Sequence, residues 1–226
     1  MGKINYHDKS ADKKGLIRAV IADDHPVIIE GLRMFFREGN VIVVATAADG
    51  AEALKAIVEH KPDVALLDLF MPGMGAIDVI KVLHKTENST KVLVLTATLD
   101  EEYLDEALDL GVSGYLLKDS VLDQVQEAIL LAMDDKIYIS PLLDKRLSKG
   151  KKSSKAAIDQ KLALLSPAEK TVLSSLAERR TNKGVAAHLK ISEKTVKNHR
   201  ANICEKLGLT GSHALLEFAV RNSGSL

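Results

Sequence analysis

The chain has 226 residues, a single cysteine, and equal numbers of acidic and basic side chains, 31 of each. This length favours two modest domains over one. No uncharged apolar run approaches the roughly 18 residues of a membrane span, no basic-then-apolar leader is present, and one cysteine excludes a disulfide framework. We therefore expect a cytoplasmic protein without membrane contact.

The neutral total conceals two halves of opposite charge. Residues 16–140 hold 10 Lys or Arg against 22 Asp or Glu, and residues 141–226 hold 17 against 7. The net charges of these segments are therefore −12 and +10. Such a division favours two domains with different partners, the second partner being a polyanion. A basic surface that is merely solvated is the plainer interpretation of the second half.

Residues 1–15 are polar and aperiodic, which is typical of a frayed tail, and we expect no function for them. After them, short β-rich runs alternate with segments of helical period as far as Ser140. The runs are 16–22, 41–47, 64–68, 91–97 and 114–118, and the helical segments include 26–36, 50–61, 100–111 and 121–133. This pattern predicts a doubly wound α/β domain over residues 16–140, with a five-stranded parallel sheet in the order 2-1-3-4-5.

Polar side chains stand at the predicted ends of four strands. The first strand ends at Asp23-Asp24, the third at Asp68, the fourth at Thr96 and the fifth at Lys118. In open α/β sheets the chemistry lies beyond the carboxyl ends of the strands. We therefore expect three carboxylates, one hydroxyl and one ammonium group to meet at one edge of the sheet.

Three carboxylates at such close range repel one another, and a hard divalent cation such as Mg²⁺ removes the conflict. Lys118 adds a second positive contact. The set is typical of a carboxylate nucleophile that accepts a phosphoryl group, with metal and lysine neutralising the phosphoryl oxygens. Taken singly, each Asp is more simply a helix cap and Lys118 a solvated charge. Their meeting at one edge favours the phosphoryl-acceptor site.

Four segments carry a family resemblance over about residues 16–138. I-A-D-D-H-P, L-L-D-L-F-M-P-G-M, V-L-T-A and G-Y-L-L-K-D resemble the receiver domain of bacterial response regulators in order and spacing. The resemblance implies a flavodoxin-like fold in which Asp68 is the phosphoacceptor and Lys118 contacts the phosphoryl group. It also implies that Mg²⁺ is held by Asp23, Asp24, Asp68 and the backbone carbonyl of Phe70.

The same resemblance implies a switch pair, Thr96 and Tyr115. In that family the Thr hydroxyl follows the phosphoryl oxygens and the aromatic ring turns inward. The sequence departs from the family pattern at Gly75-Ala76, where Asp-Gly is usual, and at Phe70, where many relatives carry a polar residue. From these departures we expect an altered loop after the third strand and slower access of hydrolytic water.

Residues 141–161 are rich in Lys, Ser and Gly with little apolar period, which is typical of a linker. From residue 162 to the end at 226 the period is helical. We predict helices over 167–178, 182–189, 193–207 and 211–221, packed into a small all-α domain. Ser166-Pro167-Ala168-Glu169 is a typical helix start, with a cap, a proline and an acid in order.

The helix predicted over 193–207 has two distinct sides. Val196, Ile203 and Leu207 form an apolar stripe with His199 and Arg200 beside it. The opposite side presents the candidate DNA contacts, namely Lys194, Thr195, Lys197, Asn198, Ala201 and Asn202. Long cations beside amides suit a helix in the DNA major groove. The plainer interpretation is the charged outer face of any soluble helix.

The stretches L-S-P-A-E-K-T-V-L and T-N-K-G-V-A-A-H-L-K-I-S-E-K-T-V-K-N-H-R-A-N-I-C-E-K-L-G resemble the LuxR-type helix-turn-helix output domain. Together with the receiver, they identify the chain as a member of the NarL/FixJ-type response regulators over about residues 16–222. The resemblance implies that 182–189 supports the recognition helix 193–207, and that 211–221 pairs two output domains. Gly184 replaces the usual Glu, and Ala201 replaces a longer polar contact residue.

The function implied is that of a two-component transcription regulator, not an enzyme. A partner histidine kinase phosphorylates Asp68, and this controls dimerisation and sequence-specific binding to double-stranded DNA, with RNA polymerase as a further partner and Mg²⁺ as cofactor. A second class stays open: a DNA-binding regulator whose receiver acts as a scaffold without phosphate. Cys204 is interpreted as a small buried residue, and the seven histidines show no metal-binding spacing.

Overall fold

The computed structural model describes residues 15–86, 88–98, 100–143 and 155–226. The predicted parallel sheet is confirmed, with its first five strands in the predicted order and a sixth at the edge, β2-β1-β3-β4-β5-β6. The strands are β1 (Ile17–Ala22), β2 (Val41–Ala47), β3 (Val64–Asp68), β4 (Lys91–Thr96), β5 (Gly114–Leu117) and β6 (Tyr138–Ile139). β6 has only two residues, too few to show an alternating pattern in the sequence.

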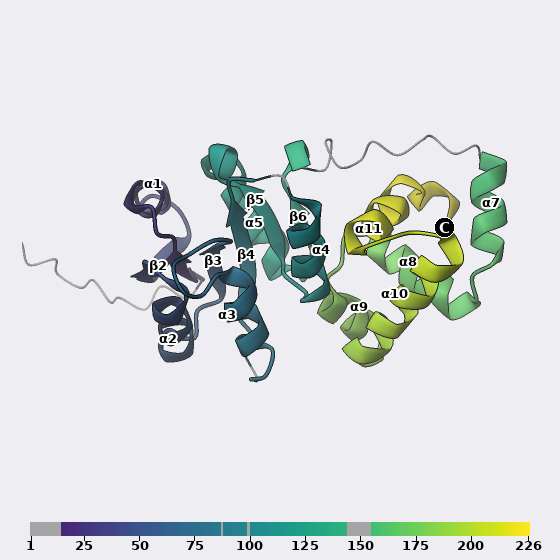
Figure 1. Ribbon diagram of the computed structural model, residues 1–226, viewed down its shortest axis with the longest axis horizontal. Coiled ribbons are helices and arrows are strands. Elements are labelled where there is room, and N and C mark those ends of the chain that lie inside the picture. The colour runs from purple at the N-terminus through teal and green to yellow at the C-terminus, as the bar shows by residue number, and fades with distance from the viewer. Residues whose placement is uncertain (1–14, 87, 99, 144–154) are drawn as a thin grey trace, which may run out of the picture.

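Helices cover both faces of this sheet (Figure 1). One face packs on α1 (Pro26–Phe36) and α5 (Val121–Met133), and the other on α2 (Gly50–His60), α3 (Ala76–Leu83) and α4 (Glu101–Asp109). Successive residues of β1 serve the two faces in turn: Ala19 and Ile21 pack toward α1 and α5, while Val20 and Ala22 pack toward the others. Burial on both faces explains why the strands are continuous apolar runs.

The second half of the chain is helical, as predicted. Its elements are α7 (Lys155–Ala163), α8 (Pro167–Ala177), α9 (Asn182–Leu189), α10 (Glu193–Leu207) and α11 (Ser212–Arg221), followed by a short 3-10 turn, η2 (Ser223–Ser225). α9 and α10 have the predicted bounds, and α8 and α11 differ by one residue at one end. Their buried side chains form one core, which includes Val172, Leu176, Val185, Val196, Ile203 and Leu215. No helix in the described part of the chain is long and apolar enough to cross a membrane.

The structure differs from the predicted linker at its carboxyl end. Residues 155–163, most of them inside the predicted linker, form α7, and Leu162 is buried in the helical core with Ile158 packed against it. The sequence of α7 mixes polar and apolar residues without a helical period, which is why the pattern did not predict this helix. Its packing against the helical core stabilises it instead. The predicted linker also differs at its amino end, because residues 141–143 are helical and Leu143 is buried in the core of the first domain. Residues 144–154 of the predicted linker lie outside the described residues.

The predicted helix start at Ser166 is a capping box. Ser166 Oγ accepts a hydrogen bond from Glu169 N at 3.3 Å, and Glu169 Oε2 accepts one from Ser166 N at 2.7 Å. We expect Ser166→Ala to lower the free energy of unfolding of the helical domain by about 1 kcal/mol. Urea titration of the full chain measures this, with Ser174→Ala as the matched control, because Ser174 only bonds within its helix to Lys170 O. Equal losses in both variants would contradict the cap.

Candidate phosphoryl-acceptor site and nucleic-acid interface

The structure brings the predicted acidic residues together at the carboxyl edge of the sheet. Asp23 and Asp68 are buried, with 0 % and 3 % of their surface exposed, while Asp24 is partly exposed. One carboxylate oxygen of each, together with His25 Nδ1, lies within a group whose atoms are all within 4.8 Å of one another. The turn after β1 is fixed by Asp23, whose Oδ1 accepts a hydrogen bond from His25 N at 2.9 Å.

Lys118 reaches the same group from the end of β5. Its Nζ lies 2.9 Å from Asp23 and 2.8 Å from Asp68 Oδ2, and only 10 % of its side chain is exposed. Burial raises the pKa of Asp68, and the hydrogen bond from Lys118 only partly opposes this. Burial alone would lower the pKa of Lys118, but its hydrogen bonds to Asp68 and Asp23 outweigh it, so this pKa is raised. The ammonium therefore stays charged beside the carboxylates.

A divalent metal ion fits this donor set. Three carboxylates face one another against a single ammonium group, so the site holds excess negative charge in a partly buried place. Carboxylate oxygens are the ligands that Mg²⁺ prefers. His25 Nδ1 lies 2.7 Å from Asp24 Oδ1 and places a nitrogen donor beside the predicted oxygen ligands. Phe70 lies beside the site, where its backbone N contacts Asp68 Oδ1 at 3.4 Å.

The predicted switch pair lies on neighbouring strands, with both residues fully buried. Thr96 Oγ1 accepts a hydrogen bond from Thr98 N at 3.1 Å, so its hydroxyl is held by the loop after β4. The ring of Tyr115 lies inside the core, and burial raises the pKa of its hydroxyl. The inward orientation that the family resemblance associates with phosphorylation is therefore the one this structure has.

Two departures from the family pattern have structural counterparts. Gly75 approaches the backbone of the loop after β3, and a Cβ there would lie 2.6 Å from the carbonyl oxygen of Leu69. A residue with a side chain does not fit this loop conformation. The ring of Phe70 is about half exposed and meets Tyr103 of α4 edge to face, with centroids 5.0 Å apart. Phe70 therefore joins the loop beside Asp68 to α4.

The candidate DNA contacts share the outer face of α10. Lys194, Lys197, Asn198, Ala201 and Asn202 are all exposed, and Val196, Ile203 and Leu207 are buried on the opposite side. Thr195 is only half-buried, but its hydroxyl lies 2.8 Å from Ser192 Oγ at the helix start. Five of the six predicted contacts are thus presented freely to solvent, while Thr195 also serves the helix cap.

Arg200 has a structural role that the sequence pattern did not indicate. It is 6 % exposed, and its guanidinium donates to Asn182 Oδ1 of α9 and to Ser212 Oγ of α11, each at 2.6 Å. Burial lowers the pKa of Arg200, with Asp109 of the first domain opposing the shift. The sequence could have indicated this role, because Arg200 shares the apolar side of the helix and a buried charge requires polar partners.

The two domains are in contact, with α4 lying against α11 (Figure 1). His213 N donates to Asp105 Oδ1 at 2.6 Å, and Ser212 Oγ donates to Asp109. Leu216 of α11 is buried in the core of the first domain. A Cβ at Gly211 would displace the Asp105 carboxylate, and the backbone φ of 88° at this position itself favours glycine. Carboxylates on an apparently solvated helix are thus domain contacts.

Both domains match known families. Residues 19–130 match the response regulator receiver domain, and residues 163–219 match the bacterial regulatory proteins of the luxR family. The matches cover the acidic edge described above and the helical unit that contains α10.

Similar proteins span nearly the whole chain. The oxygen regulatory protein NreC of Staphylococcus epidermidis is 34% identical over 212 residues, which is 91% of this chain and 97% of that protein. NreC of Staphylococcus aureus is 35% identical with the same coverage. Among solved structures, the response regulator RcsB of Salmonella typhimurium is 26% identical, with a TM-score of 0.55 over 92% of this chain and 99% of that chain. Another RcsB structure, 27% identical with a TM-score of 0.55 over 91% of this chain and 98% of that chain, contains two dimers bound to two parallel DNAs.

Proposed function

The chain belongs to the NarL/FixJ-type two-component response regulators, in which a receiver domain precedes a LuxR-type DNA-binding domain, and we propose that phosphorylation of Asp68 controls its dimerisation and its sequence-specific binding to DNA. It is a transcription regulator and not an enzyme. The observation that carries the proposal is the position of Lys118, whose ammonium group contacts both Asp23 and Asp68 at the carboxyl edge of the sheet. We take residues 16–140 as the receiver and extend the DNA-binding domain from 162 back to 155.

The acidic edge supports transfer of a phosphoryl group to Asp68. A carboxylate oxygen of Asp68 attacks the phosphorus of a kinase phosphohistidine, the P–N bond breaks, and the imidazole leaves with a proton. Lys118 neutralises charge on the phosphoryl oxygens, and Thr96 donates its hydroxyl to them. Asp23, Asp24, Asp68 and the Phe70 carbonyl would hold Mg²⁺, which when bound neutralises the oxygens of the group in transfer.

The contact between α4 and α11 supports control of dimerisation. Leu216 of α11 is 4 % exposed because the receiver covers it, and Val220 packs against the same core. When the domains separate, this apolar face becomes exposed and favours pairing with the α11 of a second copy. Phosphorylation would favour separation by moving the face of the receiver around β4, α4 and β5, where Thr96 lies.

The outer face of α10 supports binding to double-stranded DNA. Two lysines and two amides lie on one exposed side of a helix in a domain of net positive charge. A dimer would place two such helices on successive half-sites. The partners that follow are a histidine kinase as phosphodonor and RNA polymerase at the promoter, and the place of action is the cytoplasm. The alternative, regulation without phosphate, is favoured by Tyr115 already lying inward.

The test is the response of the whole chain to a phosphoryl mimic. We expect beryllofluoride with Mg²⁺ to shift the chain toward a dimer in sedimentation and to tighten its binding to a duplex selected from a random pool. Binding to that duplex should in turn favour the active receiver, because linkage is reciprocal. Lys118→Ala serves as the matched control and should lose the response. Sedimentation and binding that are indifferent to the mimic would support the phosphate-independent alternative.

A further inference from the structure

The receiver and the DNA-binding domain are also joined by main-chain hydrogen bonds. The turn between α5 and β6 lies antiparallel to the turn between α8 and α9. Ile137 N donates to Arg179 O at 2.7 Å, and Thr181 N donates to Asp135 O at 2.8 Å. Because both bonds are between backbones, they depend on how closely the two turns approach and not on side-chain identity.

Gly184 of α9 makes this close approach possible. A Cβ at Gly184 would lie 2.7 Å from the carbonyl oxygen of Asp135 and 3.1 Å from its Cβ. The obstacle is backbone, which cannot rotate away as a flexible side chain does. The first turn of α9 is itself fixed, because Gly184 N donates to Thr181 Oγ1 at 3.0 Å. A side chain at position 184 therefore forces the two turns apart.

Both turns adopt conformations that need support. Asp135 and Arg179 have φ angles of 57° and 59°, in the left-handed region that non-glycine residues adopt only where their surroundings hold them. An ion pair from Lys91 of β4 holds Asp135 on the receiver side. The folded receiver therefore holds the Asp135 carbonyl in one position, against which α9 packs.

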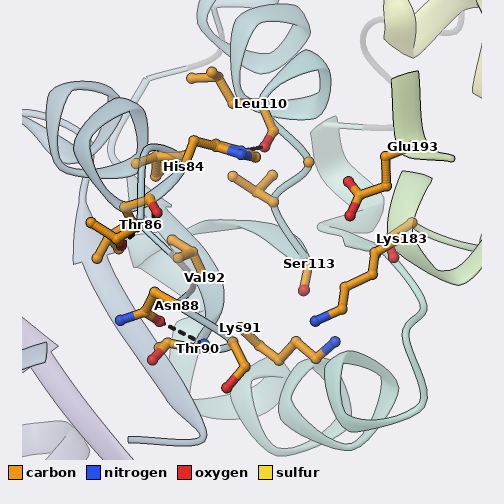
Figure 2. Close-up of a pocket in the computed structure, with 16 residues that line it drawn as sticks. His84, Thr86, Asn88, Thr90, Lys91, Val92, Leu110, Ser113, Lys183 and Glu193 are labelled. Atoms are coloured by element: carbon orange, nitrogen blue, oxygen red, sulfur yellow. Dashed lines mark hydrogen bonds between the residues drawn. The ribbon is translucent and has the colours of Figure 1, made fainter. Parts of the chain in front are cut away.

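The interface beside these turns contains a cavity. A cavity of about 240 Å³ separates Lys183 and Glu193 of the DNA-binding domain from Lys91 and Ser113 of the receiver (Figure 2). The residues that line it from the DNA-binding domain are all polar, whereas the receiver contributes both polar and apolar side chains. Few apolar contacts therefore cross this part of the interface to hold the domains together. The association depends on the remaining contacts, and a small loss in one of them changes the fraction of chains in which the domains are apart.

We propose that residues 135–137 and 179–181, here called the interdomain bridge, hold this chain in the closed arrangement, and that the lack of a side chain at Gly184 sets how firmly they hold it. The inference deepens the proposed function. It rests on that function only for its consequence, which is that closure keeps α11 from a second copy. Gly184 is thereby a regulatory residue of the DNA-binding domain that acts on the receiver.

The test compares two helical glycines, Gly184→Ala and Gly31→Ala. A Cβ at Gly31 in α1 meets nothing within 4 Å, so that variant is the matched control. Alanine is the better helix former at both positions, so both variants should keep their helices and fold as the native chain does. Gly184→Ala alone should separate the domains. Melting curves and circular dichroism confirm that each variant is folded.

The only cysteine of the chain reports the separation. Cys204 is half-buried and lines a cavity between the domains with Asp109 and Gly211. Burial raises the pKa of its thiol, and the opposing charge of Arg200 does not offset this. Opening of the domains removes this cover, so the thiol reacts faster with 5,5′-dithiobis(2-nitrobenzoate). We expect a rate increase of about three- to ten-fold in Gly184→Ala and none in Gly31→Ala, which corresponds to roughly 0.7–1.4 kcal/mol on the closed state.

The outcomes separate this inference from the proposed function. Faster labelling together with tighter binding of the unphosphorylated variant to the selected duplex supports both. Faster labelling with unchanged binding supports the interdomain bridge and contradicts the masking of α11. Equal labelling of Gly184→Ala, Gly31→Ala and the native chain overturns the inference, whatever the mimic does to the native chain.

Discussion

Replacement of Asp68 by asparagine is expected to reduce phosphoryl uptake from a small phosphodonor such as acetyl phosphate to background. An amide oxygen carries no negative charge and is a far weaker nucleophile than a carboxylate oxygen, so it does not attack phosphorus. Asp68 is also the carboxylate that Lys118 Nζ contacts at 2.8 Å, which places it beside the charge that neutralises the incoming group. Mass spectrometry of the intact chain and of its peptides measures both the amount and the position of the label.

The same experiment tests the metal. Excess chelator should slow labelling of the native chain by at least about 100-fold, because charge stabilisation by a bound metal ion is worth several kcal/mol. Asp119→Asn is the matched control, since this exposed carboxylate lies next to Lys118 in the sequence and outside the acidic group. It should label as the native chain does. Equal labelling of Asp68→Asn, or full labelling in chelator, would refute the assignment of Asp68.

The alternating strands and helices of the receiver were predictable from the sequence. Strands buried on both faces give continuous apolar runs, and their order in a doubly wound sheet follows from the alternation with helices. Once the sheet was inferred, Asp23, Asp68 and Lys118 had to meet at one edge, although each alone resembled a cap or a solvated charge. The acidic group and the Lys118 contacts show that this inference needed only strand ends and strand order.

The contact between the domains could not be predicted in this way. Asp105 and Asp109 lie on a helix with acidic residues throughout, so nothing in the pattern distinguishes a domain contact from a solvated face. Gly184 departed from the family pattern without an evident reason, and its reason is the carbonyl oxygen of Asp135, 49 residues away in the sequence and in another domain. Contacts between two folded domains leave no periodic pattern in the sequence. The sequence of α7 likewise has no clear apolar period, so this helix was not predicted.

Base reading and charge on α10 can be separated by substitution. Lys197 and Asn198 lie in the middle of its exposed face and are proposed to meet base edges in the major groove. Alanine at either position should cost roughly 1–3 kcal/mol at the selected duplex and less on random DNA. Specificity should therefore fall together with affinity. The ratio of the two dissociation constants, measured at several salt concentrations, gives this result directly.

Lys194 is the matched control on the same face, because it lies in the first turn of α10, nearer the phosphate backbone in the proposed docking. Lys194→Ala should weaken binding to the selected duplex and to random DNA about equally, and should reduce the salt slope by about one, since one phosphate contact releases about one counterion. Lys194 and Lys197 are both exposed lysines of α10, so helix propensity and effects on folding do not distinguish their alanine variants. If Lys197→Ala and Asn198→Ala leave the ratio of the two affinities as it is in the native chain, this face of α10 does not read sequence, and the proposed orientation of the helix in the groove is wrong.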